Sequence, residues 1–293
     1  VLHLLVQLPG LIQLGFRWMP VCELNEPNVR RMLRILVPRI LTVFFVQLIF
    51  IFRDNLASRL TSGSVTALSY GYMFQQLPET LIGTALGTAL LPSLSIFIAE
   101  GKRAEFEAVF TKALRIVVAL TFGSAVIMGL GVGPLASFAL DLSTVETSML
   151  VWTLAGFLIG LTGHCLLEVT NRSFYAQQDA FSPLLATIIN FILFVGFGLG
   201  LYRTVGVAGI SLSDSFAFTA QALLLIFWLK FDPVRRSRIL SRIPGARIFG
   251  ETGEANLDRR ISIGTTFDMW ATARAAVGAI VSAMVLWFIV YSN

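Results

Sequence analysis

The stretch SPLLATIINFILFVGFGLGLY, residues 182–202, decides the fold class. It holds no charged side chain, and an α-helix needs about 20 such residues to cross the ~30 Å hydrocarbon core of a membrane. In lipid, a helix satisfies its own backbone hydrogen bonds, whereas an irregular segment exposed to lipid cannot. The stretch therefore predicts a membrane-spanning helix, and the rest of the chain repeats its pattern.

Seven further apolar runs lie on either side of this stretch. They cover residues 1–16 (incomplete), 36–52, 68–99, 113–140, 147–171, 205–229 and 268–290. Charged residues make up 13% of the 293, about half of the roughly 25% typical of soluble domains. We therefore expect an all-α, polytopic integral membrane helical bundle. Because the chain opens on Val1 inside an apolar run, we also expect it to be part of a longer protein.

The distribution of Lys and Arg predicts how the bundle is oriented. Counted from the N-terminus, the odd-numbered loops hold 18 of these residues and the even-numbered loops hold 3. By the positive-inside rule, the odd-numbered loops are cytoplasmic. The basic stretch 230–247 directly follows a span, so it serves to stop transfer and to attract anionic membrane lipid. No folded basic domain with interleaved aromatic residues indicates nucleic-acid binding.

The sequence shows no constellation typical of an enzyme. It lacks a G-x-S-x-G motif, a phosphate-binding loop and an H-E-x-x-H motif, so we expect no catalytic residues and no enzymatic activity. Cys22 and Cys165 are expected to be unpaired thiols. His3 and His164 have no partners at ligand spacing, so neither a metal site nor a bound cofactor is predicted.

The informative residues are polar groups inside or at the ends of the spans. An ionised side chain at mid-bilayer costs about 2.5–3.5 kcal/mol on insertion scales, so it is expected to face a cavity or a partner. The candidates for a cavity or substrate site are Arg53, Gln75, Gln76, Glu79 and Arg172. The candidates for a cation site are Asp54, Asn190 and Asp214.

Simpler interpretations stand beside these. Arg53 and Asp54 could mark the interface where a span leaves the membrane. Glu168 and Arg172 are four residues apart, which permits an ion pair worth about 0.2–0.5 kcal/mol on one helix face. Glu79 has apolar runs on both sides and is harder to explain in this way.

Asp214 lies in the run GISLSDS, residues 209–215, in which three serines stand near the carboxylate. Such hydroxyls alongside an intramembrane carboxylate favour a cation or proton site.

The run 68–99 carries its own structural signals. Pro78 and Pro92 each remove an intrahelical hydrogen bond, so a kink or a break is predicted there. Gly83 and Gly87 lie four residues apart on one helix face, and such spacing permits close approach of a neighbouring helix.

Ordered motifs run along nearly the whole chain. They are LLVQLP at 4–9 with GFR at 15–17, LAS at 56–58, GSVTAL at 63–68, QLP at 76–78, Gly83, LLPSLS at 90–95, and NRSFYAQQD at 171–179 with Pro183. This set resembles the MurJ/MviN lipid II flippases, and its last member resembles that family's R-x-F-Y-A-x-x-D-x-x-x-P signature.

The resemblance implies a fourteen-helix member of the multidrug/oligosaccharidyl-lipid/polysaccharide exporter superfamily. It assigns 1–18 to the end of helix six, 19–35 to a cytoplasmic loop, 36–231 to a second six-helix lobe (helices seven to twelve), 232–264 to a basic cytoplasmic loop, and 265–293 to helix thirteen. The implied function is the movement of lipid II across the bacterial cytoplasmic membrane by alternating access, for peptidoglycan biosynthesis. The implied partners are the lipid-linked glycan substrate, membrane lipids that are anionic at the basic loop, and a first lobe of the same chain. Na+ or H+ is the candidate coupling ion.

Met73 departs from the pattern, because the resemblance places a cavity arginine at this position. The departure leaves two other functions open. One is the export of another polyprenyl-linked glycan, and the other is a non-transporting membrane scaffold for cell-wall synthesis.

The cation-binding positions of the family also differ. Arg53 stands where the resemblance places an aspartate, with Asp54 one residue later, and Phe194 stands where an acid or amide is expected. Asn190 matches, and Asp214 replaces a threonine. We therefore hypothesise a cation site rebuilt from Asn190 and Asp214.

Overall fold

The computed structural model describes residues 27–139 and 143–229, and Gly10 before them. The chain divides into two compact units, 1–34 and 35–293. Everything that follows on packing concerns the second unit. Apart from Gly10, the predicted segments 1–18, 232–264 and 265–293, and with them the two spans at the ends of the chain, lie outside the described residues.

The described residues form helices joined by short turns, and no strand occurs among them. The helices are α2 (Pro27–Ala57), α3 (Ser64–Pro78), the π-helix η1 (Glu79–Thr84), α4 (Ala85–Ala99), α5 (Arg103–Ala139), α6 (Thr144–Ala176), α7 (Phe181–Val205) and α8 (Val207–Leu229). Six helical stretches are long and apolar enough to cross a membrane, counting α3, η1 and α4 as one. The predicted all-α membrane bundle is confirmed.

Several helices extend beyond the predicted apolar runs. The loop expected at 19–35 is helical from Pro27, because α2 begins there and continues through Pro38. α7 continues to Val205, so the run predicted to start at 205 begins only at Val207. Gly206, with a φ of 68°, makes the turn between these two helices. Apolar composition therefore located the spans but not the polar turns of helix beyond them.

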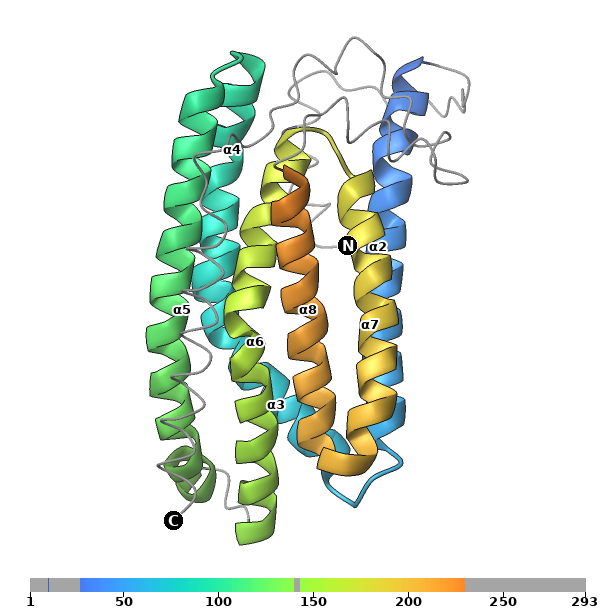
Figure 1. The fold of residues 1–293 in the computed structure, drawn as a ribbon, viewed down its shortest axis with the longest axis vertical. Helices are drawn as coiled ribbons and strands as arrows, with labels where there is room; N and C mark the ends of the chain where they lie inside the picture. The colour runs from blue at the N-terminus through green and yellow to red at the C-terminus, as the bar shows by residue number, and fades with distance from the viewer. Residues whose placement is uncertain (1–9, 11–26, 140–142, 230–293) are drawn as a thin grey trace. The chain divides into compact units, whose positions relative to one another are not determined.

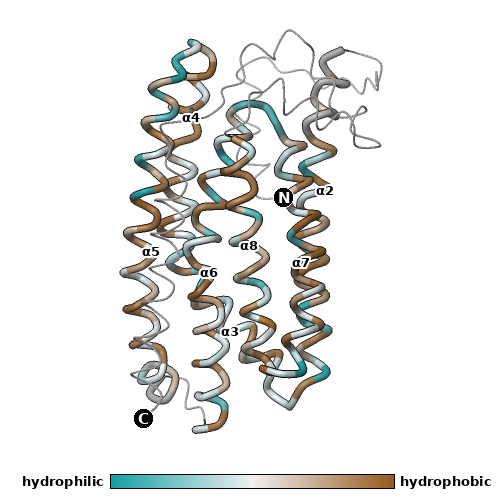
Figure 2. The backbone as a smooth tube through the Cα atoms, viewed as in Figure 1, coloured by the Kyte–Doolittle hydropathy of each residue, from teal (hydrophilic) through white to brown (hydrophobic). Residues whose placement is uncertain are grey.

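α6 and α8 lie side by side at the centre of the bundle, with α4 and α5 on one side and α7 and α2 on the other (Figure 1). Edge-on contact of Phe52 with Phe194 joins α2 to α7. Figure 2 shows hydrophobic residues along the helices and hydrophilic ones at the turn between α6 and α7. Leu81 and Ile127 are among the exposed apolar side chains, as expected of helices that face lipid.

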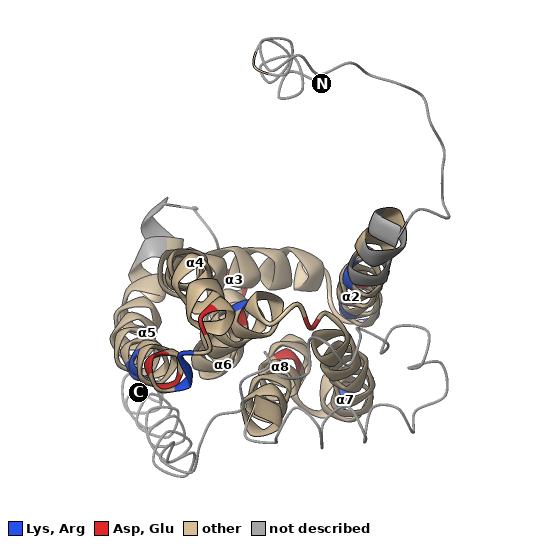
Figure 3. Ribbon diagram, turned by 90° about the horizontal axis from the view of Figure 1, so that it is seen from above, with Lys and Arg blue, Asp and Glu red and all other residues tan. Residues whose placement is uncertain are grey.

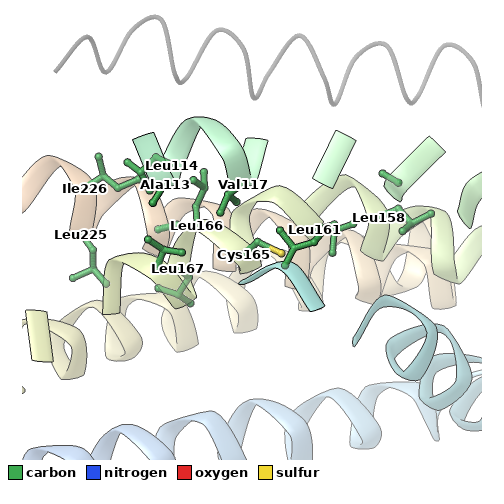
Figure 4. Packing of buried hydrophobic residues seen from close by; sticks show 14 of the residues in the cluster. Ala113, Leu114, Val117, Leu158, Leu161, Cys165, Leu166, Leu167, Leu225 and Ile226 are labelled. Atoms are coloured by element: carbon green, nitrogen blue, oxygen red, sulfur yellow. The ribbon is translucent and has the colours of Figure 1, made fainter. Parts of the chain in front are cut away.

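Buried apolar side chains fill the contacts between α5, α6 and α8 (Figure 4). Leu114 and Val117 come from α5, Leu161 from α6, and Leu225 and Ile226 from α8. Because lipid is as apolar as these side chains, close packing and interhelical hydrogen bonds stabilise the bundle more than exclusion from water does.

A row of glycines on α6 lets α8 approach it closely. Cβ atoms added to the glycines at 156, 160 and 163 would collide with Ser211, Ser215 and Thr219 of α8, respectively. The Ser215 hydroxyl uses this closeness to donate a hydrogen bond of 2.6 Å to the Gly156 carbonyl oxygen. Small residues at one-turn spacing thus bring the two central helices together.

The run 68–99 bends where the sequence predicted a kink. Directly after Pro78, the helix widens into η1 before it resumes as α4, while Pro92 stays inside α4 without ending it. An added Cβ at Gly83 would lie 2.9 Å from Cys165 Cα, and one at Gly87 would lie 3.1 Å from Arg172 Cγ. The predicted close approach at these glycines is confirmed, and the neighbouring helix is α6.

Candidate functional site

A cluster of ionisable side chains lies where η1, α6 and α8 meet. His164 of α6 is at its centre, with Nε2 3.1 Å from Asp214 Oδ2 and Nδ1 3.7 Å from Glu79 Oε1. The His164 and Asp214 side chains are 4% and 3% exposed, and the Glu79 side chain is 16% exposed. Seen along the helices, an acidic residue lies on α8, which is next to α6 (Figure 3).

Residues one turn away hold the cluster in place. Phe218, four residues after Asp214, stacks on the His164 ring with centroids 4.1 Å apart and planes at 17°. Gln75, four residues before Glu79, donates its amide N–H to Glu79 Oε2 at 3.3 Å. Phe218 therefore positions the imidazole, and Gln75 positions the Glu79 carboxylate.

The cluster unites three predicted site residues, Gln75, Glu79 and Asp214, around a histidine that sequence reasoning missed. His164 has no ligand partner near it in the chain, because Asp214 is 50 residues away along the sequence. The sequence does contain a hint of this partner: one apolar run holds an imidazole, and two other apolar runs each hold a single carboxylate.

The hydroxyls near Asp214 in sequence do not surround its carboxylate. Ser211, Ser213 and Ser215 donate to the backbone carbonyl oxygens of Ala208, Gly209 and Gly156. Ser211 and Ser213 thus bond the preceding turn of α8, as serines in a helix readily do, and Ser215 bonds across to α6.

Asn190 belongs to a different network, between α7 and α8. Its Nδ2 donates to Gln221 Oε1 at 2.6 Å, and Gln221 Nε2 donates to Thr187 Oγ1 at 2.9 Å. Gln221 lies two turns after Asp214, about 10 Å along the helix axis. Within the described ranges, no hydrogen bond joins Asn190 to Asp214, and the hypothesised cation site from this pair stays a prediction.

Arg53 and Asp54 have opposite surroundings. The Asp54 side chain is 53% exposed, whereas that of Arg53 is 6% exposed. The Arg53 guanidinium carbon lies 4.6 Å from the Phe50 ring centroid and 4.8 Å from that of Tyr72, an arrangement typical of cation–π stacking. Its Nε is 3.6 Å from Asp54 Oδ1, and its Nε and Nη1 make no hydrogen bond. Asp54 thus lies at the surface, and Arg53 keeps unused donors inside.

The predicted ion pair of Glu168 and Arg172 is confirmed, with 3.3 Å between Arg172 Nη2 and Glu168 Oε2. The buried Nε of Arg172 has no hydrogen-bond partner. Gln76 is exposed on α3, as is Met73, and neither joins the cluster around His164. Among the residues that the structure describes, no three His, Cys, Asp or Glu side chains are placed to hold a metal ion.

Comparison with known proteins gives a consistent picture. The family model described as "Lipid II flippase MurJ" matches residues 1–242. Lipid II flippase MurJ of Burkholderia cenocepacia is 32% identical over 237 residues, which are 78% of this chain and 46% of that protein. Probable lipid II flippase MurJ of Rhizobium meliloti is 26% identical over 250 residues, 80% of this chain and 46% of that protein. The chain thus spans about half the length of these relatives.

Two solved structures share the fold. The inward closed conformation of lipid II flippase MurJ has a TM-score of 0.61 at 17% identity, covering 94% of this chain and 57% of that chain. A transporter of the MOP superfamily from Pyrococcus furiosus has a TM-score of 0.62 at 14% identity, covering 87% and 52%. For that transporter, reversed polarity of the binding pocket is reported to suggest a different function.

Proposed function

This chain belongs to the lipid II flippase MurJ family, and on that premise we propose that it is the second half of a protein that moves lipid II across the bacterial cytoplasmic membrane. The family is one of transporters and not of enzymes. The chain itself is a multi-pass protein of that membrane. The observation that carries the proposal is the family match, which includes every described helix.

Two arginines suit the anionic part of such a substrate. Arg53 and Arg172 each keep buried N–H groups without a hydrogen-bond partner. Guanidinium groups bind phosphate oxygens through short, charge-assisted hydrogen bonds, so a pyrophosphate would satisfy these donors. Both residues were candidates for a cavity or substrate site from the sequence.

The two arginines lie near opposite ends of the bundle. Arg53 is in the last turns of α2, and Arg172 is in the last turns of α6, and these helix ends lie at opposite ends of the bundle (Figure 1). In the predicted topology, Arg172 is on the cytoplasmic side and Arg53 on the outer side. Arg172 would therefore meet the pyrophosphate on entry, and Arg53 would meet it before release.

Transport requires a partner for this half. Alternating access works by two halves that rock against each other around a site near the membrane midplane. We propose that the first lobe, in the part of the protein outside this chain, is that partner. The lipid tail of the substrate stays in the membrane while its polar head passes between the lobes.

The export of another polyprenyl-linked glycan is a second candidate. The observation that favours it is Met73, which is 62% exposed on α3. A methionine offers no charged donor at this surface, where the family resemblance places an arginine. A protein with this change would recognise a different head group through other contacts.

Rescue of a flippase-depleted bacterium by the full-length gene tests the proposal. We expect growth to be restored and lipid II to become accessible on the outer leaflet. Arg53→Gln and Arg172→Gln should reduce this exposure. Thr121→Val should not, because it removes a buried hydroxyl contact between α5 and α6 and hydrogen bonds to carbonyls of α5, but no charged group. Correct membrane insertion without lipid II exposure would refute the proposal, and exposure of a different lipid-linked glycan would establish the second candidate.

A further inference from the structure

The cluster around His164 lies against the bend in the α3–η1–α4 segment. Glu79 is the first residue of η1, immediately after Pro78. π-Helical turns are rare and occur frequently at functional sites, where helices change their path. The charge of an ionisable side chain at this position therefore affects how strongly the bent segment is attached to α6.

The two carboxylates differ in their hold on the imidazole and in access. Asp214 hydrogen-bonds His164 Nε2 at 3.1 Å, whereas Glu79 is 3.7 Å from Nδ1, beyond hydrogen-bonding distance. Asp214 is fully buried, and Glu79 is the more exposed of the two. The hydrogen-bonded contact of His164 with α8 is therefore shorter than its ionic contact with η1.

Other charged and titratable groups face the cluster from three helices. Glu168 lies one turn after His164 on α6 and is paired with Arg172. Tyr72 of α3 is within electrostatic range of Glu79, Asp214, Glu168 and Arg53. With both carboxylates ionised and the imidazole protonated, the cluster carries one net negative charge. One further proton, on Glu79, removes the negative charge through which η1 is attracted to the imidazolium of α6.

The contact that would open on release is also defined. Gly83, in the same π-helix as Glu79, lies so close to Cys165 that an added Cβ would be 2.9 Å from Cys165 Cα. Cys165 follows His164 directly and is fully buried. Separation of η1 from α6 would therefore expose the Cys165 thiol.

We propose that Glu79, His164 and Asp214 form a proton-binding switch, in which a proton taken up at Glu79 releases the α3–η1–α4 segment from the α6–α8 pair. The ligand is H+ and not a metal cation. Asp214 Oδ2 lies within hydrogen-bonding distance of His164 Nε2, and in the described part of the chain no three His, Cys, Asp or Glu side chains are placed to hold a metal ion. Proton binding by these three residues does not depend on the proposed function. Only its consequence, the exchange between inward and outward access, rests on that function.

Cys165 labelling tests the switch without any substrate. The full-length protein is reconstituted in liposomes with Cys22 and any cysteine elsewhere replaced by serine, and it is treated with a membrane-permeant maleimide over a range of pH. The thiolate is the reactive form, so labelling rises with pH in every variant. Each wild-type rate is therefore divided by the rate for Glu79→Gln, which mimics the protonated carboxyl, at the same pH.

We expect this ratio to be near one at acidic pH and to fall on the alkaline side, by up to about tenfold per pH unit for a transition linked to one proton. His164→Gln should flatten the ratio, while Thr121→Val should leave it like wild type. Thr121→Val is the matched control because it removes a buried hydrogen bond of α6, to Thr162, without removing a titratable group.

A ratio that stays constant with pH, or that responds to Na+ in place of choline and not to pH, would overturn the switch. If His164→Gln does not fold, the partly exposed Glu79→Gln variant still tests the switch. Its labelling rate must match that of wild type at acidic pH and exceed it at alkaline pH. Lipid II transport with a constant ratio sinks the switch and leaves the flippase function standing. A pH-dependent ratio without transport supports the switch and sinks the flippase function.

Discussion

Replacing Gly160 by alanine tests the close contact between α6 and α8. The new Cβ would lie 2.5 Å from Ser215 Cα and 2.6 Å from Ser215 Cβ, so backbone would have to move on one of the two central helices. Overpacking of this kind costs about 1–3 kcal/mol. Alanine also favours helix over glycine by about 0.5–1 kcal/mol, which partly offsets the collision.

Gly196→Ala is the matched control, because a Cβ added to Gly196 of α7 would meet no atom within 4 Å. The gain in helix propensity is common to both variants, so the difference between their free energies of unfolding isolates the collision. We expect Gly160→Ala to be less stable than Gly196→Ala by about 1–3 kcal/mol. The measurement is equilibrium unfolding of the full-length protein in mixed micelles of rising SDS content. Equal stability of the two variants would refute the close contact of α6 and α8.

Three further changes have defined outcomes. Asn190→Ala leaves the buried Gln221 carbonyl without its donor, so we expect a loss of about 1–3 kcal/mol in the same unfolding assay, and a loss below the error of the assay would contradict the network. Asp179→Ala removes the carboxylate that caps the start of α7 by accepting hydrogen bonds from Ser182 N–H and Oγ–H. We expect a loss of about 0.5–2 kcal/mol in unfolding free energy and faster hydrogen exchange in the first turn of α7. Unchanged exchange there would argue against this cap. Arg53→Lys keeps the charge but loses the flat guanidinium between Phe50 and Tyr72, so outer-leaflet exposure of lipid II should fall with it as it does with Arg53→Gln, and full activity of the lysine variant would show that charge alone suffices.

The sequence predicted the helices well because lipid imposes a simple rule on composition. Runs of apolar residues located the spans, and Pro78, Gly83 and Gly87 located the bend and the close approach. The start of α2 and the end of α7 were missed, since a helix continues past the hydrocarbon wherever its polar turns are still satisfied.

The site was predicted only in part. Glu79 and Asp214 stood out because a lone carboxylate in an apolar run is costly wherever its partner is. The partner itself, His164, could not be deduced, since it depends on how three helices pack. The hydroxyls next to Asp214 were misleading for the opposite reason: they are close in sequence, but their helix turns them toward backbone carbonyls.

The π-helix at η1 has a consequence for the angular phase of the segment that follows it. Each residue of an α-helix turns the chain by about 100°, and the wider π-turn takes up an additional residue without advancing that phase equally. α3 and α4 therefore do not share one continuous pattern of inward and outward positions, although they form one span. If Glu79–Thr84 became regular α-helix with all six residues kept, α4 would turn by roughly 100° about its axis. Gly87 would then leave the face that meets α6, and larger side chains would take its place against Glu168 and Arg172.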